Sequence, residues 1–168
     1  MIKPDEVEIK VDPEISSEQL FSFYQRNAIC EEGFGKEAAA IPLKNSAFIV
    51  AAFFKDELVG IARATFDGIA ANIMEFCLAI ELQGEKLKYT NGSLMQKDTY
   101  GIGKNMGTIL VNELFKKGAT FISYDIVENC EEPFYESIGL VRKQGHVVYY
   151  IDQRGYKDDP KFITKANF

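Results

Sequence analysis

The chain has 168 residues, of which 46% are hydrophobic and 26% charged, and its formal net charge is −6. This length predicts one globular domain over residues 1 to 157, followed by a short polar tail at 158 to 168. The acidic balance disfavours nucleic acid as a partner, and the absence of an apolar run of roughly 20 residues or of a signal-peptide pattern predicts a cytoplasmic protein without a membrane partner.

The first predicted element is a helix that begins after Ser16. Ser16 and Gln19 have the spacing of a capping box, and the run from 17 to 28 places its apolar side chains along one stripe. The glycine-containing connection that follows, from 30 to 46, is expected to hold one further helical turn.

Three strand-like runs come next and predict an antiparallel meander. Lys55-Asp56 separates the first two, and a turn at Asp67-Gly68 separates the last two. The runs cover residues 46 to 54, 57 to 66 and 71 to 80.

Polar and apolar residues alternate in the third run. We therefore expect Glu75, Cys77, Ala79 and Glu81 to share one face of the sheet. The polar stretch from 83 to 97 that follows is predicted to be a long loop or a ribbon extension.

The second half of the chain is predicted to add a helix, a strand, a helix and a closing hairpin. Gly118 and Gly139 stand where the two helices would end. The predicted elements cover residues 104 to 117, 119 to 127, 129 to 138 and 140 to 151.

Two glycines, Gly101 and Gly103, directly precede the helix predicted from Lys104. A P-loop is excluded because Asn105 stands where a serine or threonine is needed, and a dinucleotide fingerprint is excluded because no apolar strand comes directly before the glycines. Exposed backbone N–H groups at a helix N-terminus favour an anion such as a pyrophosphate. Glycines that merely turn the chain are the alternative interpretation.

These motifs resemble those of the GNAT superfamily of N-acetyltransferases, whose cofactor motif is Q/R-x-x-G-x-G/A and whose next helix carries an asparagine, then FYExxGF. Gly101 and Gly103 match the glycines, Asn129 matches the asparagine, and "FYESIGL" matches the last motif. The resemblance covers about residues 7 to 155. Asp98 departs from it, because the family usually has glutamine or arginine there, and it puts a carboxylate near the expected pyrophosphate.

The resemblance implies an α/β (α+β) fold with a mixed, mostly antiparallel sheet of six to seven strands and about four helices. It also implies transfer of an acetyl group from acetyl-CoA to a primary amine of a small molecule or peptide in a ternary complex, and it leaves a homodimer open. The cofactor-binding residues that it implies are Leu78, Ala79, Ile80, Tyr100, Gly101, Ile102, Gly103, Lys104, Asn105, Asn129 and Phe134.

Acetyl transfer to an amine would benefit from a base, because an alkylamine with a pKa of about 10.4 is a free base in only about one molecule in a thousand at pH 7. Glu75 and Glu81 are the candidates, and solvated strand carboxylates are the alternative interpretation. Tyr135 matches the family's usual general acid, and an aromatic side chain packed beside Phe134 is the alternative for it.

The three cysteines and the one histidine predict no metal site, because no CxxC or HExxH pattern is present. A covalent route through Cys77 or Cys130 is the less favoured mechanism, since no histidine is placed to activate either thiol. A predicted helix start at Cys130 would lower its pKa.

Two other classes of protein compete with the enzyme. One is a non-catalytic acyl-CoA-binding sensor or regulatory domain, and the other is a nucleotide-binding module. The acetyltransferase prediction depends on open backbone amides around Gly101 and Gly103, so capping of these amides by the protein's own side chains that left no opening for the pantetheine would overturn it.

Overall fold

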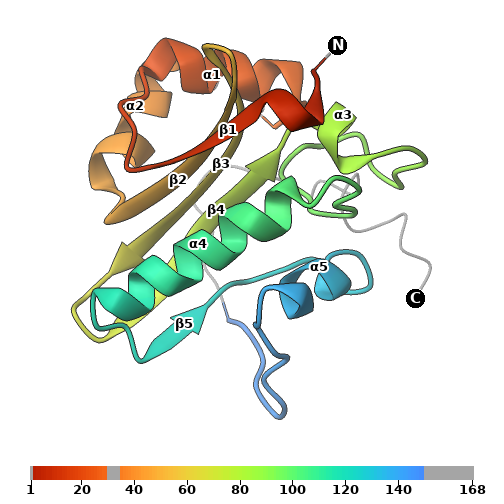
Figure 1. Ribbon diagram of the computed structural model, residues 1–168. Helices are drawn as coiled ribbons and strands as arrows, with labels where there is room; N and C mark the ends of the chain where they lie inside the picture. Colours follow the sequence, from red (N-terminus) through yellow and green to blue (C-terminus); the bar gives the residue numbers. More distant parts are fainter. Residues whose placement is uncertain (1, 30–34, 150–168) are drawn as a thin grey trace.

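The computed structural model describes residues 2 to 29 and 35 to 149, which fold around a single five-stranded sheet (Figure 1). The strand order follows the sequence. Strands β1 to β4 pair antiparallel, and β5 pairs parallel to β4. The strands are β1 (Val7–Val11), β2 (Phe48–Phe54), β3 (Glu57–Phe66), β4 (Ala70–Leu78) and β5 (Phe121–Ser123).

Helices cover both faces of this sheet. Helices α1 and α2 lie on one face and α4 lies on the other, while α5 lies beside β5 (Figure 1). The helices are α1 (Ser17–Arg26), α2 (Lys36–Asn45), α3 (Ile80–Gln83), α4 (Ile102–Lys116) and α5 (Glu132–Ser137), and a 3-10 turn η1 (Pro4–Glu6) precedes β1.

One close approach fixes α4 against the middle of the sheet. A Cβ atom at Gly60 in β3 would lie 3.1 Å from both Leu78 Cδ1 and Met106 Sδ. The absence of a side chain at Gly60 therefore leaves room for Met106 of α4, which is fully buried in the core.

Several local predictions are confirmed. The meander forms with turns at the two predicted places, and Ser16 caps α1 with the reciprocal Gln19 bond of a capping box. Gly118 and Gly139 both follow helices with positive φ, of 104° and 95°. The residue types at these positions set the local backbone without help from distant parts of the chain.

The predicted number of strands is wrong, because the described residues form five strands rather than six to seven. The predicted closing hairpin has no strand over residues 140 to 149, and its last two residues lie outside the described ranges. Strand β5 is only three residues long, so it offers this segment little edge on which to pair.

Two elements were not predicted at their true extent, and the described residues form five helices rather than about four. Strand β1 is a short edge strand with two buried or half-buried apolar positions among charged residues, so it reads as a polar segment. Helix α2 runs for ten residues where one turn was expected, and it contains Pro42 in its interior, a residue that weighs against a long helix.

A β-bulge interrupts the alternation predicted for β4. Arg63 pairs with Glu75 and Ala64 pairs with Ile73, so Met74 is the extra residue on β4 and is exposed. The chain leaves the strand after Leu78 and enters α3, so Ile80 and Glu81 lie in a helix rather than in the predicted strand. The bulge directs Glu75 to the α1 face together with Arg63.

Strands β4 and β5 separate soon after they begin to pair. They pair only from Ala70 with Phe121 to Asn72 with Ser123, so the edge of β4 from Ile73 onward has no strand beside it. The polar groups on this edge need other partners. None of the helices in the described ranges combines the length and hydropathy that crossing a membrane requires.

Leu110→Ala is expected to lower the free energy of unfolding by about 2–5 kcal/mol, because Leu110 is fully buried in α4 and its removal leaves a cavity. Phe115→Ala, on the exposed side of the same helix, is the matched control and should cost less than about 1 kcal/mol. Urea unfolding followed by circular dichroism would measure both. Equal losses would mean that α4 does not pack on the sheet as described.

Candidate functional site

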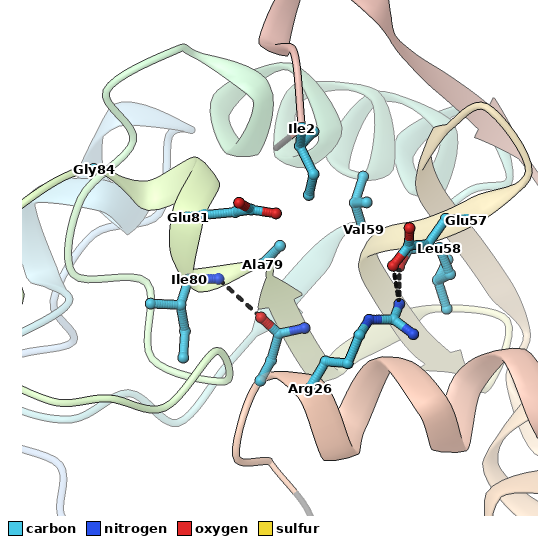
Figure 2. Close-up of a pocket in the computed structure, with 10 residues that line it drawn as sticks. Ile2, Arg26, Glu57, Leu58, Val59, Ala79, Ile80, Glu81 and Gly84 are labelled. Carbon is cyan, nitrogen blue, oxygen red and sulfur yellow. Dashed lines mark hydrogen bonds and ion pairs between the residues drawn. The ribbon is translucent and has the colours of Figure 1, made fainter.

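A cavity of about 550 Å³ opens where β4 ends and α3 begins (Figure 2). It is bounded by Ile2, the end of α1, the start of β3 and the first turn of α3. The lining residues are Ile2, Arg26, Asn27, Glu57, Leu58, Val59, Ala79, Ile80, Glu81 and Gly84. Three residues of the predicted site, Ala79, Ile80 and Glu81, are therefore brought together at one cavity.

The charges around this cavity are arranged on two sides. Figure 2 shows the Glu81 side chain directed into the cavity, with Arg26 and Glu57 on the opposite side. Arg26 forms an ion pair with Glu57 at 2.9 Å and also donates to the carbonyl of Leu58 at 3.1 Å. Glu81 has no ion-pair partner among the described residues, so its carboxylate can receive a cation.

Asn27 fixes the end of β4 and was missed by sequence reasoning. Its Oδ1 atom accepts the Ile80 N–H at 2.9 Å, and its Nδ2 atom donates to the Phe23 carbonyl at 2.9 Å. Its own carbonyl accepts the Gly92 N–H at 2.8 Å. Because Asn27 lies 53 residues from Ile80 in the sequence, no local pattern could have identified it.

The second candidate base, Glu75, lies in a buried polar cluster between α1 and the sheet. Only 9% of Glu75 is exposed, and its carboxylate accepts from Arg63 Nε and from the Cys77 thiol, the latter at 3.2 Å. Burial together with the nearby Glu75 charge raises the pKa of the Tyr24 hydroxyl in the same cluster. Glu75 thus has partners of its own and does not line the cavity, which sets it apart from Glu81.

The two thiols that a covalent route would use are poorly ionised. Burial, reinforced by the Glu75 charge, raises the pKa of Cys77 well above its usual range. Burial and the Glu131 charge also raise the pKa of Cys130, so the expected lowering by a helix start is wrong. Helix α5 begins only at Glu132, after Cys130 and Glu131, and is short.

Gly101 forms a turn before α4, as the alternative interpretation of the glycines expects. Gly101 adopts a left-handed conformation with φ of 72°, and α4 starts at Ile102. The N–H groups of Gly103 and Lys104 donate to Asp98, at 2.9 Å to Oδ1 and 2.7 Å to Oδ2. Two of the amides expected to bind a pyrophosphate are thus capped by a side chain of the protein.

Residues 84 to 98, here called the covering segment, connect α3 to this turn without a helix or strand of their own. The carbonyl of Gly92 accepts the Leu78 N–H at 3.0 Å. Met95 is fully buried, and its N–H donates to Glu131 Oε1 at 2.7 Å. A Cβ atom at Gly103 would lie 2.6 Å from Met95 Cε, so the small residue accommodates the covering segment.

Glu131 is a buried carboxylate that sequence reasoning did not select. It accepts the N–H groups of Met95 and Val127, and so ties the covering segment to the approach to α5. Burial raises the pKa of its carboxyl, although these hydrogen bonds act in the opposite direction. Its partners lie 36 and 4 residues away, and only the nearer one could have been expected from spacing.

Tyr135 lies in α5 with 2% of its surface exposed. Its ring packs against Tyr124 and Phe134, each with ring centroids 4.9 Å away. Its hydroxyl is buried close to the Tyr124 hydroxyl and the Glu131 carboxylate, but among the described residues it makes no hydrogen bond of normal geometry. Burial raises the pKa of this hydroxyl well above its usual range.

Of the remaining predicted residues, four are exposed to solvent and Phe134 is buried. Asn129 is exposed with φ of 59°, and its N–H donates to Glu132 Oε2 at 2.9 Å. Phe134 is buried against Phe76 in an edge-to-face contact. Tyr100, Lys104 and Asn105 are exposed at the turn and first turn of α4.

Acetyl-CoA, which the sequence resemblance implies, does not fit its expected place while the covering segment keeps the position described above. A diphosphate at the start of α4 would need the Gly103 and Lys104 amides that Asp98 occupies. A pantetheine arm along β4 would need the Leu78 N–H that Gly92 occupies. The fold supplies the donors, but the chain itself holds them.

Comparison with solved structures identifies the fold. A Staphylococcus aureus protein described as a "probable acetyltransferase" aligns with a TM-score of 0.67 at 17% identity, covering 87% of this chain and 98% of that one. A GNAT-family acetyltransferase from Streptococcus pneumoniae aligns with a TM-score of 0.58 at 19% identity, covering 88% of this chain and 98% of that one. An aminoglycoside N-acetyltransferase solved with CoA aligns with a TM-score of 0.58 at 11% identity, covering 88% of this chain and 95% of that one.

These likenesses show that the chain has the fold of the GNAT acetyltransferases, as the resemblance in sequence predicted. No protein-family model and no curated protein matches the chain. Residues in the structure, rather than a relative, must therefore support any assignment of chemistry.

Alkylation by iodoacetamide at pH 8 tests the covalent route. We expect Cys77 in the folded protein to react at least about tenfold more slowly than Cys130. Each pKa unit above the working pH lowers the thiolate fraction about tenfold, and the pKa of Cys77 is raised well above its usual range. Cys77 is also only 1% exposed, so the reagent has little access to it. Peptide mass spectrometry would follow each thiol, with the guanidinium-unfolded chain as control. Rapid labelling of Cys77 in the folded protein would contradict the buried cluster.

Proposed function

We propose that the chain is an acetyl-CoA-dependent N-acetyltransferase that acts on a primary amine of a small molecule or peptide. The GNAT fold supports acetyl transfer as the general chemistry. The observation that carries the proposal is the cavity just after the end of β4, because it joins Ala79 and Ile80, two residues expected beside the thioester, to a carboxylate, Glu81, that faces inward (Figure 2).

The size and lining of this cavity suit a small amine. Its volume of about 550 Å³ lies within the 300–1,000 Å³ that is usual for ligand pockets. Leu58 and Ala79 offer an apolar wall, and Glu81 offers a negative charge on one side. We therefore propose an acceptor that carries its ammonium group on an apolar carbon chain.

Glu81 is the proposed amine-binding carboxylate. A carboxylate in water is a far weaker base than an alkylamine, so complete removal of the proton by Glu81 alone is strongly uphill. We assign Glu81 the tasks of holding the ammonium group and of passing its proton to water as the amine becomes neutral. Glu75 is a less suitable base, because Arg63 and Cys77 already occupy its oxygens.

Tyr135 stays a proposed hydrogen-bond donor. A buried donor without a partner costs about 1–3 kcal/mol, and the Tyr135 hydroxyl, close to Tyr124 and Glu131, is in that position. This unmet donor supports a role for the hydroxyl in a bound state. Packing of the ring against Phe134 and Tyr124 would by itself be served equally well by phenylalanine.

The second candidate function is a non-catalytic domain with the same fold. The hydrogen bonds from Gly103 and Lys104 to Asp98, and from Leu78 to Gly92, favour it, because they close the donors that an acyl-CoA would use. Calorimetric titration with CoA and with ATP, combined with a turnover assay, separates the candidates. Binding of CoA without turnover of any amine would favour a sensor, and binding of ATP alone would favour a nucleotide-binding module.

Glu81→Gln is expected to lower kcat/KM about tenfold to a hundredfold, because the variant keeps the shape of the side chain and loses the charge that holds the amine. Release of CoA thiol from acetyl-CoA, measured across a panel of primary amines, gives the rate. Glu14→Gln is the matched control, since Glu14 is exposed, lies outside the covering segment and does not line the cavity. An unchanged rate for Glu81→Gln would remove Glu81 from the site.

A further inference from the structure

We infer that the covering segment and an acyl-CoA compete for the same backbone donors, so that residues 84 to 98 must leave their place before the cofactor binds. This inference rests on the proposed function, and it gives that function a built-in autoinhibitory contact. The reason is that the backbone N–H groups expected to bind the cofactor already donate to the Asp98 carboxylate and to the Gly92 carbonyl.

The first contact is made by Asp98 at the start of α4. Each of its two carboxylate oxygens accepts one N–H, from Gly103 and from Lys104, at 2.9 and 2.7 Å. An anionic group at the positive end of a helix is stabilised by these donors and by the helix dipole. A diphosphate in the same place would lose both donors and would also be repelled by the Asp98 charge.

The second contact lies at the edge of β4 and does not involve Asp98. Gly92 accepts the Leu78 N–H and donates its own N–H to the Asn27 carbonyl, at 3.0 and 2.8 Å. A Cβ atom at Gly92 would lie 2.8 Å from Asn27 Cβ and 3.0 Å from the Leu78 carbonyl oxygen. The backbone at Gly92 thus takes the position beside β4 that an extended arm of a ligand would need.

A third contact holds the middle of the covering segment. Met95 is fully buried, and Glu131 accepts its N–H at 2.7 Å. The segment is therefore attached in three places. Gly92 binds the edge of β4, Met95 binds Glu131 just before α5, and Asp98 binds the start of α4. Weakening one attachment lowers the free energy that a ligand must supply to release the others.

Asp98→Asn tests the competition directly. Asparagine keeps one acceptor oxygen but loses the charge, so the attachment to α4 weakens and the repulsion of a diphosphate disappears. We expect the Kd for CoA, measured by isothermal titration calorimetry, to fall at least about tenfold. Asp67→Asn is the matched control, because Asp67 also caps two amides, those of Ile69 and Ala70, but at a turn outside the site.

Hydrogen exchange of the unaltered protein gives a second readout that does not depend on a variant. Saturating CoA should speed exchange at the Gly92 and Met95 amides, because both lose their partners when the segment leaves. Exchange at amides within β2 and β3 should be unchanged.

The outcomes separate this inference from the proposed function. If the unaltered protein binds CoA, Asp98→Asn binds it no more tightly and Gly92 stays protected in the complex, the competition is refuted while the acetyltransferase remains. If neither protein binds CoA, both are refuted. Tighter binding by Asp98→Asn but not by Asp67→Asn, together with faster exchange at Gly92, supports the inference.

Discussion

The edge of β4 loses its neighbouring strand after Asn72, and its backbone donors must find other partners. The covering segment supplies one of them, because Gly92 accepts the Leu78 N–H. Asp98, at the end of the same segment, accepts the N–H groups of Gly103 and Lys104 in the first turn of α4. The separation of two strands thus leaves a donor that the covering segment satisfies, and the chain's own residues occupy the site that the sequence resemblance predicted.

The balance between the covering segment and a ligand depends on magnitudes that are close to one another. A hydrogen bond to a charged group contributes about 1.5–3 kcal/mol, and three such bonds, two to Asp98 and one to Glu131, tie the covering segment to the rest of the chain. A ligand with micromolar affinity gains about 8.2 kcal/mol on binding. The segment can therefore oppose a ligand of ordinary affinity without excluding one that binds tightly.

Local patterns predicted the features of this fold that depend on neighbouring residues, such as the cap at Ser16 and the helix ends at Gly118 and Gly139. The bulge at Met74 and the role of Asn27 could not be predicted, because each depends on a partner strand or loop far away in the sequence. Asp98 stood out as a departure from the family motif. Its capping of the Gly103 and Lys104 amides could not be predicted, because it depends on the geometry of the turn between them.

The shared use of these donors is the central claim, and titration of ¹⁵N-labelled protein with CoA, followed by amide chemical shifts, tests it most directly. The amides of Leu78, Gly103 and Lys104 should shift together with one saturation curve, because a single ligand replaces Gly92 and Asp98 as their acceptors. Binding of CoA that leaves all three amides in place would contradict the account.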